Sequence, residues 1–152
     1  MISRITNFLE KITNASQETK EALSASELHI ATAALLIEVA SIDQHIDELE
    51  LTALGHTLSQ RFSLTQDELN ALIEHAKQAS NEAASLYQFT QLINRHCNDK
   101  EKYDLACGLW EVAYADNILD KHEEHIIRRI ADLIHLRHSD FIRAKHHARD
   151  NT

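Results

Sequence analysis

Residues that form tight turns are nearly missing from this chain: proline is absent, and glycine occurs only as Gly55 and Gly108. Hairpins and β-sandwiches use such residues at their many turns, so an all-β fold is disfavoured. Alanine, leucine, glutamate, glutamine and lysine are common, and all are good helix formers. We therefore predict an all-α protein. Its 152 residues, of which 43% are hydrophobic, suffice for one domain with a buried core.

Apolar spacing and capping patterns divide the chain into eight predicted helices. The first covers residues 2–12, and the second runs from a Ser-x-x-Glu capping box at 24–27 to Ile42. A second capping box, Thr65 to Glu68, opens the fourth helix, and residues 80–84 are a predicted linker. The other helices are predicted at about 47–61, from 86 to the break at 98–100, from there to about 115, at 120–135, and after a cap at Ser139-Asp140.

One stretch of the sequence is repeated at an offset of 73 residues. Residues 36–54 (LIEVASIDQHIDELELTAL) and 109–127 (LWEVAYADNILDKHEEHII) are identical at seven of nineteen positions, and four of the seven are acidic. Each copy is typical of an αα-hairpin, with a helix, a tight acidic turn and a second helix. Two such hairpins predict a bundle of seven to eight helices with an internal pseudo-two-fold duplication. Repeat one would cover about 26–79 and repeat two about 99–148 of a single 1–152 domain.

The acidic turns carry the pattern A-x-x-D-x-x-φ-D-x-x-E twice, from Ala40 to Glu50 and from Ala113 to Glu123. This duplicated pattern resembles the TerB-like (tellurite resistance) family, to which the TerB-like region of the co-chaperone DjlA is related. The resemblance covers residues 26–148. It implies a helical bundle with an acidic surface cluster, a link to tellurite and stress resistance, and metal binding. Many family members have glycine after the first aspartate, so the first turn is expected to differ in shape here.

Four of the repeated acids occupy positions suited to helix capping. Asp47 and Asp120 would be N-caps that accept an early backbone N–H, and Glu50 and Glu123 could reach back to the cap N–H. A cap side chain contributes about 1 kcal/mol. A purely structural role would therefore explain these four acids, and binding a ligand is the alternative.

The other four acids are harder to explain by structure alone. Asp43 and Asp116 follow helix C-termini, where the macrodipole disfavours negative charge unless a turn hydrogen bond or a bound cation offsets it. Glu38 and Glu111 lie inside apolar runs, where an ionised carboxylate needs a partner; we hypothesise that each faces the other repeat's acidic turn. Oxygen ligands favour Ca²⁺ or Mg²⁺ over Zn²⁺, and no other cofactor is expected. The candidate metal ligands are Glu38, Asp43, Asp47, Glu50, Glu111, Asp116, Asp120 and Glu123.

Enzyme activity is not expected, because the sequence has no nucleophile elbow, Walker motif or dinucleotide fingerprint. The turns are not EF-hands either, since position 12 of a loop that starts at Asp116 is Ile127. His122 and His125 share a helix face and could bind Zn²⁺, with exposed surface histidines as the alternative. A metal-dependent enzyme is the least favoured hypothesis.

The charge of the chain constrains its partners. A net charge of −9 argues against nucleic acid. Residues 128–152 nevertheless carry +3, so at most a peripheral contact with anionic lipid is expected. Cys97 and Cys107 form no CxxC pair, and no secretory signal or membrane span is evident, so we expect a cytoplasmic protein with reduced thiols.

Two functional hypotheses lead. The first is a non-catalytic stress-resistance module with a duplicated cation site. The second is a protein–protein interaction domain whose acidic turns are only caps. Both expect a protein partner, and the sequence leaves homo-oligomerisation open.

Overall fold

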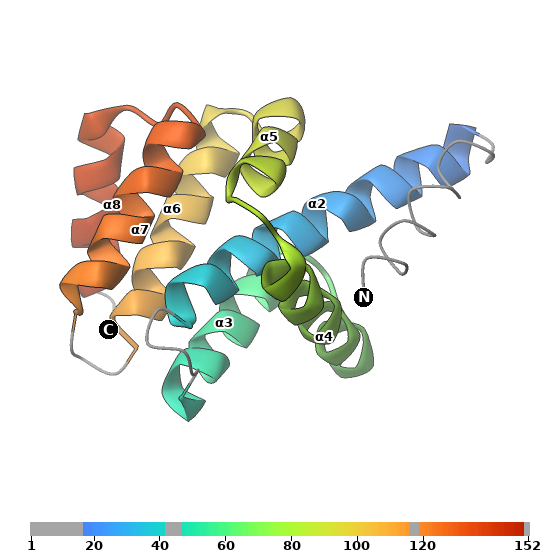
Figure 1. Ribbon diagram of the computed structural model, residues 1–152, viewed down its shortest axis with the longest axis horizontal. Helices are drawn as coiled ribbons and strands as arrows, with labels where there is room; N and C mark the ends of the chain where they lie inside the picture. The colour runs from blue at the N-terminus through green and yellow to red at the C-terminus, as the bar shows by residue number, and fades with distance from the viewer. Residues whose placement is uncertain (1–16, 42–46, 116–118, 151–152) are drawn as a thin grey trace.

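The computed structural model describes residues 17–41, 47–115 and 119–150, which form seven α-helices and no strand (Figure 1). The all-α prediction is confirmed. The predicted helix over 2–12 lies outside the described residues. The helices are α2 (Gln17–Ala40), α3 (Glu48–Arg61), α4 (Gln66–Glu82), α5 (Tyr87–His96), α6 (Asp99–Ala113), α7 (Lys121–Leu133) and α8 (His138–Asp150). None of these described helices is long and apolar enough to cross a membrane.

Helices α2 and α6 form the centre of the bundle. All side chains from Ala31 to Ala40 are buried except Glu38, and all from Leu105 to Ala113 are buried except Glu111. Helix α2 contacts α3, α4, α5, α6 and α7, while α6 contacts α2, α3, α7 and α8. A helix that is apolar around its circumference belongs in a core, and these two apolar runs obey that rule.

The outer helices pack on the two central ones in a paired pattern. The most extensive contacts are between α2 and α4 and between α6 and α8. Helix α3 follows α2 but also packs on α6, while α7 follows α6 but also packs on α2. Two hairpins that face each other would produce this pattern, in which the second helix of each hairpin packs on the first helix of the other. The internal duplication itself stays a prediction.

Reciprocal capping boxes begin α4 and α6, and the first of them was predicted from the sequence. Thr65 Oγ1 accepts the Glu68 N–H at 3.2 Å, and the Glu68 carboxylate accepts the Thr65 N–H at 3.0 Å. Asn98 and Glu101 form a second reciprocal box that opens α6, with distances of 2.9 and 3.0 Å. Asn98 therefore begins α6 directly after Cys97, the C-cap of α5.

Two predicted boundaries in the first half were wrong. The Ser-x-x-Glu pattern at 24–27 does not start a helix, because α2 begins at Gln17 and runs through it. Glu21, Ala22 and Leu23 directly before the pattern favour helix, and a capping pattern inside a helix-forming stretch does not by itself mark a helix start. Helix α4 also continues through part of the predicted linker and ends at Glu82, with Ala83 as its C-cap.

Two boundaries in the second half also differ. Helix α7 ends at Leu133, and His135 adopts a left-handed φ of 60°. The N–H groups of His135 and Leu136 donate to the carbonyls of Asp132 and Ala131, which is a Schellman ending with histidine where glycine is usual. Helix α8 starts at His138, so Asp140 lies in its first turn and binds Arg137 and Arg143 instead of capping the helix.

Candidate functional site

The two glutamates of the central helices meet hydroxyl groups from neighbouring helices. Ser80 Oγ of α4 donates to Glu38 Oε1 at 2.6 Å, and Thr57 Oγ1 of α3 donates to Glu111 Oε2 at 3.4 Å. These hydrogen bonds meet part of the requirement that a partly buried carboxylate has a polar partner. The Thr57–Glu111 contact joins repeat one to repeat two. The hypothesis that each glutamate faces the other repeat's acidic turn stays a prediction.

The two predicted N-caps are present at the starts of α3 and α7. Asp47 Oδ1 accepts the Glu50 N–H at 2.8 Å, and Asp120 Oδ1 accepts the His122 N–H at 2.7 Å. The two caps therefore differ by one residue in the N–H that they accept. Each cap uses one carboxylate oxygen, and for the other oxygen no hydrogen bond is found among the described residues.

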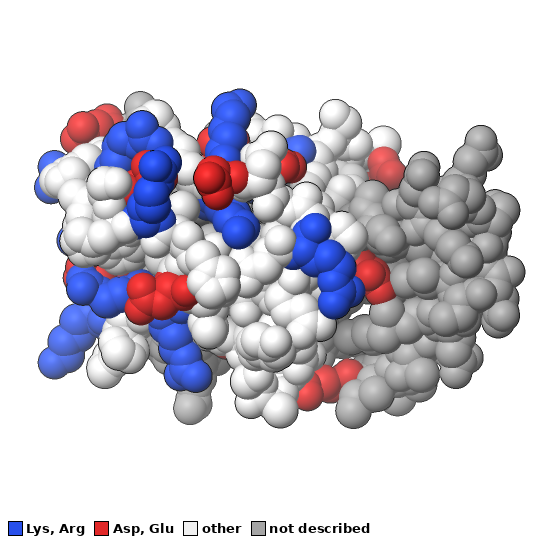
Figure 2. Space-filling view, turned by 90° about the horizontal axis from the view of Figure 1, so that it is seen from above, with Lys and Arg blue, Asp and Glu red and all other residues white. Residues whose placement is uncertain are grey.

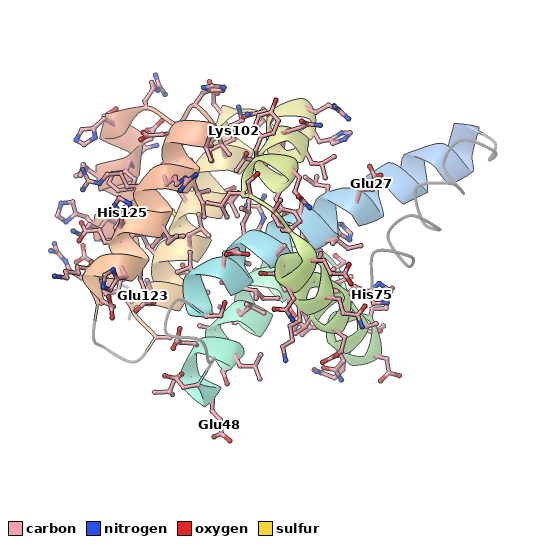
Figure 3. All side chains as sticks on the ribbon, in the orientation of Figure 1. Glu27, Glu48, His75, Lys102, Glu123 and His125 are labelled. Carbon is pink, nitrogen blue, oxygen red and sulfur yellow. The ribbon has the colours of Figure 1, made fainter. Side chains whose placement is uncertain are left out.

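The glutamates three residues after these caps are buried. Glu50 and Glu123 are each 6% exposed, although both lie in the first turn of their helices, where glutamate is normally solvated. Figure 3 labels Glu48 at the start of α3 and Glu123 at the start of α7, and both helices begin on the lower side of that view. The C-terminal ends of α2 and α6 lie on the same side (Figure 1).

Asp43 and Asp116 lie outside the described residues. The six other candidate ligands are placed, and neither they nor any other described side chains form a group of three or more that could hold a metal ion. The described candidate ligands therefore form an Asp–Glu pair at the start of α3, a second such pair at the start of α7, and two glutamates on α2 and α6 that accept hydroxyl hydrogen bonds. His122 and His125 are both exposed on α7, and among the described residues they belong to no group of side chains that could hold a metal ion.

A cleft between α3 and α6 was missed by sequence reasoning. It has a volume of about 520 Å³, and Glu111 is the one predicted ligand on its wall. Arg61 donates from Nη1 to the Glu101 carbonyl at 3.1 Å beside it, and Cys107 also lines it. Burial raises the pKa of the Cys107 thiol, so this cysteine is poorly suited to act as a nucleophile. No spacing in the sequence signals this cleft, because its walls come from separate helices.

Charges of both signs mix on the surface. Figure 2 shows blue and red side chains interspersed over the described part of one face. On α7 and α8, Glu124 pairs with Arg128 and Lys145, and Asp140 pairs with two arginines. Each of these two carboxylates therefore pairs with two cations, and the peripheral lipid contact stays a prediction.

Comparison with known proteins places the chain in a family. A family model described as tellurite resistance protein TerB matches residues 29–146. A crystal structure of a protein of unknown function from Porphyromonas gingivalis W83 superimposes with a TM-score of 0.60 at 20% sequence identity, covering 82% of this chain and 95% of the other. At that identity the likeness shows the fold alone. No curated protein gives a significant match. Because the family model spans most of the sequence, including both acidic hairpins, the chain belongs to the TerB family, as its duplicated motif predicted.

Proposed function

We propose that this protein is a non-catalytic TerB-like module that binds divalent cations at the bends of its two hairpins and serves in tellurite or stress resistance. The observation that carries the proposal is the recurrence of a buried glutamate three residues after an N-cap aspartate at both hairpins. Glu50 follows Asp47, and Glu123 follows Asp120, with the same 6% exposure of the two glutamates.

The physical argument concerns the concentration of negative charge. A capping aspartate and a buried glutamate on one helical turn place two carboxylates close together, and the helix N-terminus compensates only about half an elementary charge. Each hairpin adds a third carboxylate by sequence, Asp43 or Asp116, directly after a helix C-terminus whose carbonyl groups are negative as well. A hard cation would bind both kinds of oxygen. Ca²⁺ fits best because it accepts six to eight oxygen ligands in irregular geometry, and Mg²⁺ is the next choice.

Thermal melting in the presence of metals tests this proposal. The wild type is melted with Ca²⁺, Mg²⁺, Zn²⁺ or EDTA, beside an Asp43→Asn/Asp116→Asn variant and an Asp67→Asn/Glu74→Gln control that removes two exposed acids of α4. At a concentration of 100 Kd, a bound cation stabilises by about 2.7 kcal/mol, or roughly 5–10 °C for a chain of this size. The control should keep that gain, and the bend variant should lose it.

A protein-interaction domain is the second candidate, and one observation favours it. Leu49 and Leu51 at the start of α3 are 58% and 38% exposed, whereas the equivalent positions of repeat two are His122 and Glu124. An apolar pair beside the first bend suits contact with a protein more than contact with an ion. If no metal changes the melting temperature, this candidate replaces the first. Iron or zinc retained through purification would instead favour a metal-dependent enzyme.

A further inference from the structure

Helix α5 closes one seam of the bundle, the line along which α2 and α7 meet. It packs on both α2 and α7. Asn94 Nδ2 donates to the Leu133 carbonyl at the end of α7, at 2.9 Å. At the α2 side, burial raises the pKa of Glu27, and the positive charges of His96 and Arg95 oppose that rise. Helix α5 therefore lies across the seam between α2 and α7, with its last turn close to both helices.

The repeat predicted from the sequence would make that seam equivalent to the one between α6 and α3. At the offset of 73, Leu133 corresponds to Gln60 and Glu27 to Lys100. Gln60 lines the cleft of about 520 Å³, together with Arg61 and Phe62 at the end of α3, and the opposite wall is α6 from Glu101 onward. By this predicted correspondence, the position that α5 fills on one seam is, among the described residues, an open cleft on the other.

The open seam differs from the closed one in charge. Glu101, Asp104 and Glu111 all lie on its α6 wall. Among the described residues, Asp104 and Glu111 form no ion pair. Arg61 is the one arginine on the wall, and its buried Nε has no acceptor within the described part of the chain. The three acidic side chains outnumber Arg61 and His147 on the described wall, so the cleft favours a positively charged ligand.

We propose that this cleft binds an amphipathic helix of a partner protein, with lysine or arginine facing α6 and apolar residues facing Phe62 and Leu28. A helix is the expected shape because α5 occupies the seam that the predicted repeat makes equivalent, and a basic face is expected because acidic side chains outnumber basic ones on the described wall. The inference goes beyond the cation site, since the seam is formed by the end of α3 and by α6, not by the helix starts at the bends.

Peptide binding tests the proposal, with all measurements made in EDTA so that cation binding plays no part. The probe is a fluorescein-labelled amphipathic helical peptide of leucine and lysine, and its twin carries glutamate in place of lysine. Affinity is measured by fluorescence anisotropy for the wild type, for Asp104→Lys in the cleft, and for the matched control Glu74→Lys on the exposed face of α4. Both changes reverse one exposed mid-helix charge, so the fold should survive in each.

The lysine peptide should bind the wild type saturably, and Asp104→Lys should weaken that binding by about fivefold or more, with Glu74→Lys within about twofold of the wild type. A second cleft variant, Gln60→Lys, should weaken binding in the same direction. Amide NMR shifts on peptide addition should concentrate in residues 57–62 and 101–111.

Three results would overturn the proposal: no saturable binding of the lysine peptide, equal losses in Asp104→Lys and Glu74→Lys, or shifts centred on Leu49 and Leu51. Self-association of the wild type that Asp104→Lys abolishes, measured by sedimentation velocity, would also overturn it. That result would make a second copy of the chain the occupant of the cleft.

Discussion

Replacing Gly108 with alanine tests how closely α3 approaches α6. A Cβ atom at position 108 would lie 2.6 Å from Thr57 Cγ2, which is closer than two carbon atoms can be without a shift. Thr57 has little freedom to move away, because it is 5% exposed and its hydroxyl donates to Glu111. The glycine is therefore required by the crossing of the two helices.

The magnitude follows from two opposing effects. Alanine is about 1 kcal/mol better than glycine inside a helix, while inserting a carbon into a filled contact costs about 1–3 kcal/mol. We expect Gly108→Ala to lower the free energy of unfolding by about 1 kcal/mol, which is roughly 2–4 °C in melting temperature for this chain length. The control is Gly55→Ala, whose Cβ would meet Leu69 Cδ2 at an ordinary 3.6 Å. That variant should gain about 0.5–1 kcal/mol.

Urea unfolding followed by far-UV circular dichroism gives the free energy for each variant. The double variant Thr57→Ser/Gly108→Ala removes the clashing methyl group and keeps the hydroxyl, so it should recover most of the loss and show a favourable coupling in a double-mutant cycle. If Gly108→Ala is as stable as Gly55→Ala, or if the Thr57→Ser change gives no rescue, the close approach of α3 and α6 is refuted.

Three further predictions concern a cap, a histidine and a thiol. Asp120→Ala should cost about 1 kcal/mol in urea unfolding because a helix N-cap is lost, and Asp120→Asn should restore most of it. Burial against the Phe62 ring, with ring centroids 3.8 Å apart, lowers the pKa of His29. The folded state then binds fewer protons than the unfolded one, so this contribution to stability is complete above a pH of about 6.5 and is lost as pH falls. Substituting His29→Gln should flatten the change in the urea midpoint between pH 7.5 and 5, and an unchanged slope would contradict the assignment. In a Cys97→Ser background, Cys107 should react with a thiol reagent at pH 7.5 far more slowly in the native than in the unfolded protein, because burial raises its pKa; equal rates would show that it is accessible.

The helices were predictable to the extent that their signals are local. Thr65 and Asp120 are the N-caps of α4 and α7, as predicted, because a capping hydrogen bond spans only two or three residues. The same local reasoning misplaced the start of α2, since Ser24 in a strongly helical stretch is compatible with both a cap and a helix interior. The left-handed turn at His135 was not predictable, because histidine adopts this conformation more often than most residues but still only in a small minority of positions.

The candidate site was predictable only as a set of sequence positions. The repeat identified Glu50 and Glu123 as equivalent, and both are indeed buried. The hydroxyl partners of Glu38 and Glu111 were missed, because Ser80 and Thr57 lie 42 and 54 residues from them in sequence. The cleft was missed for the same reason. Contacts between helices distant in the chain depend on packing geometry, which periodicity and capping rules do not encode.

Calorimetric titration of calcium tests the central claim, that two equivalent acidic hairpins each bind a cation. The wild type should bind two Ca²⁺ ions per chain, Asp43→Asn or Asp116→Asn alone should leave one, and the double variant should leave none. Absence of calcium and magnesium binding by the wild type, or undiminished binding by the double variant, would contradict the account.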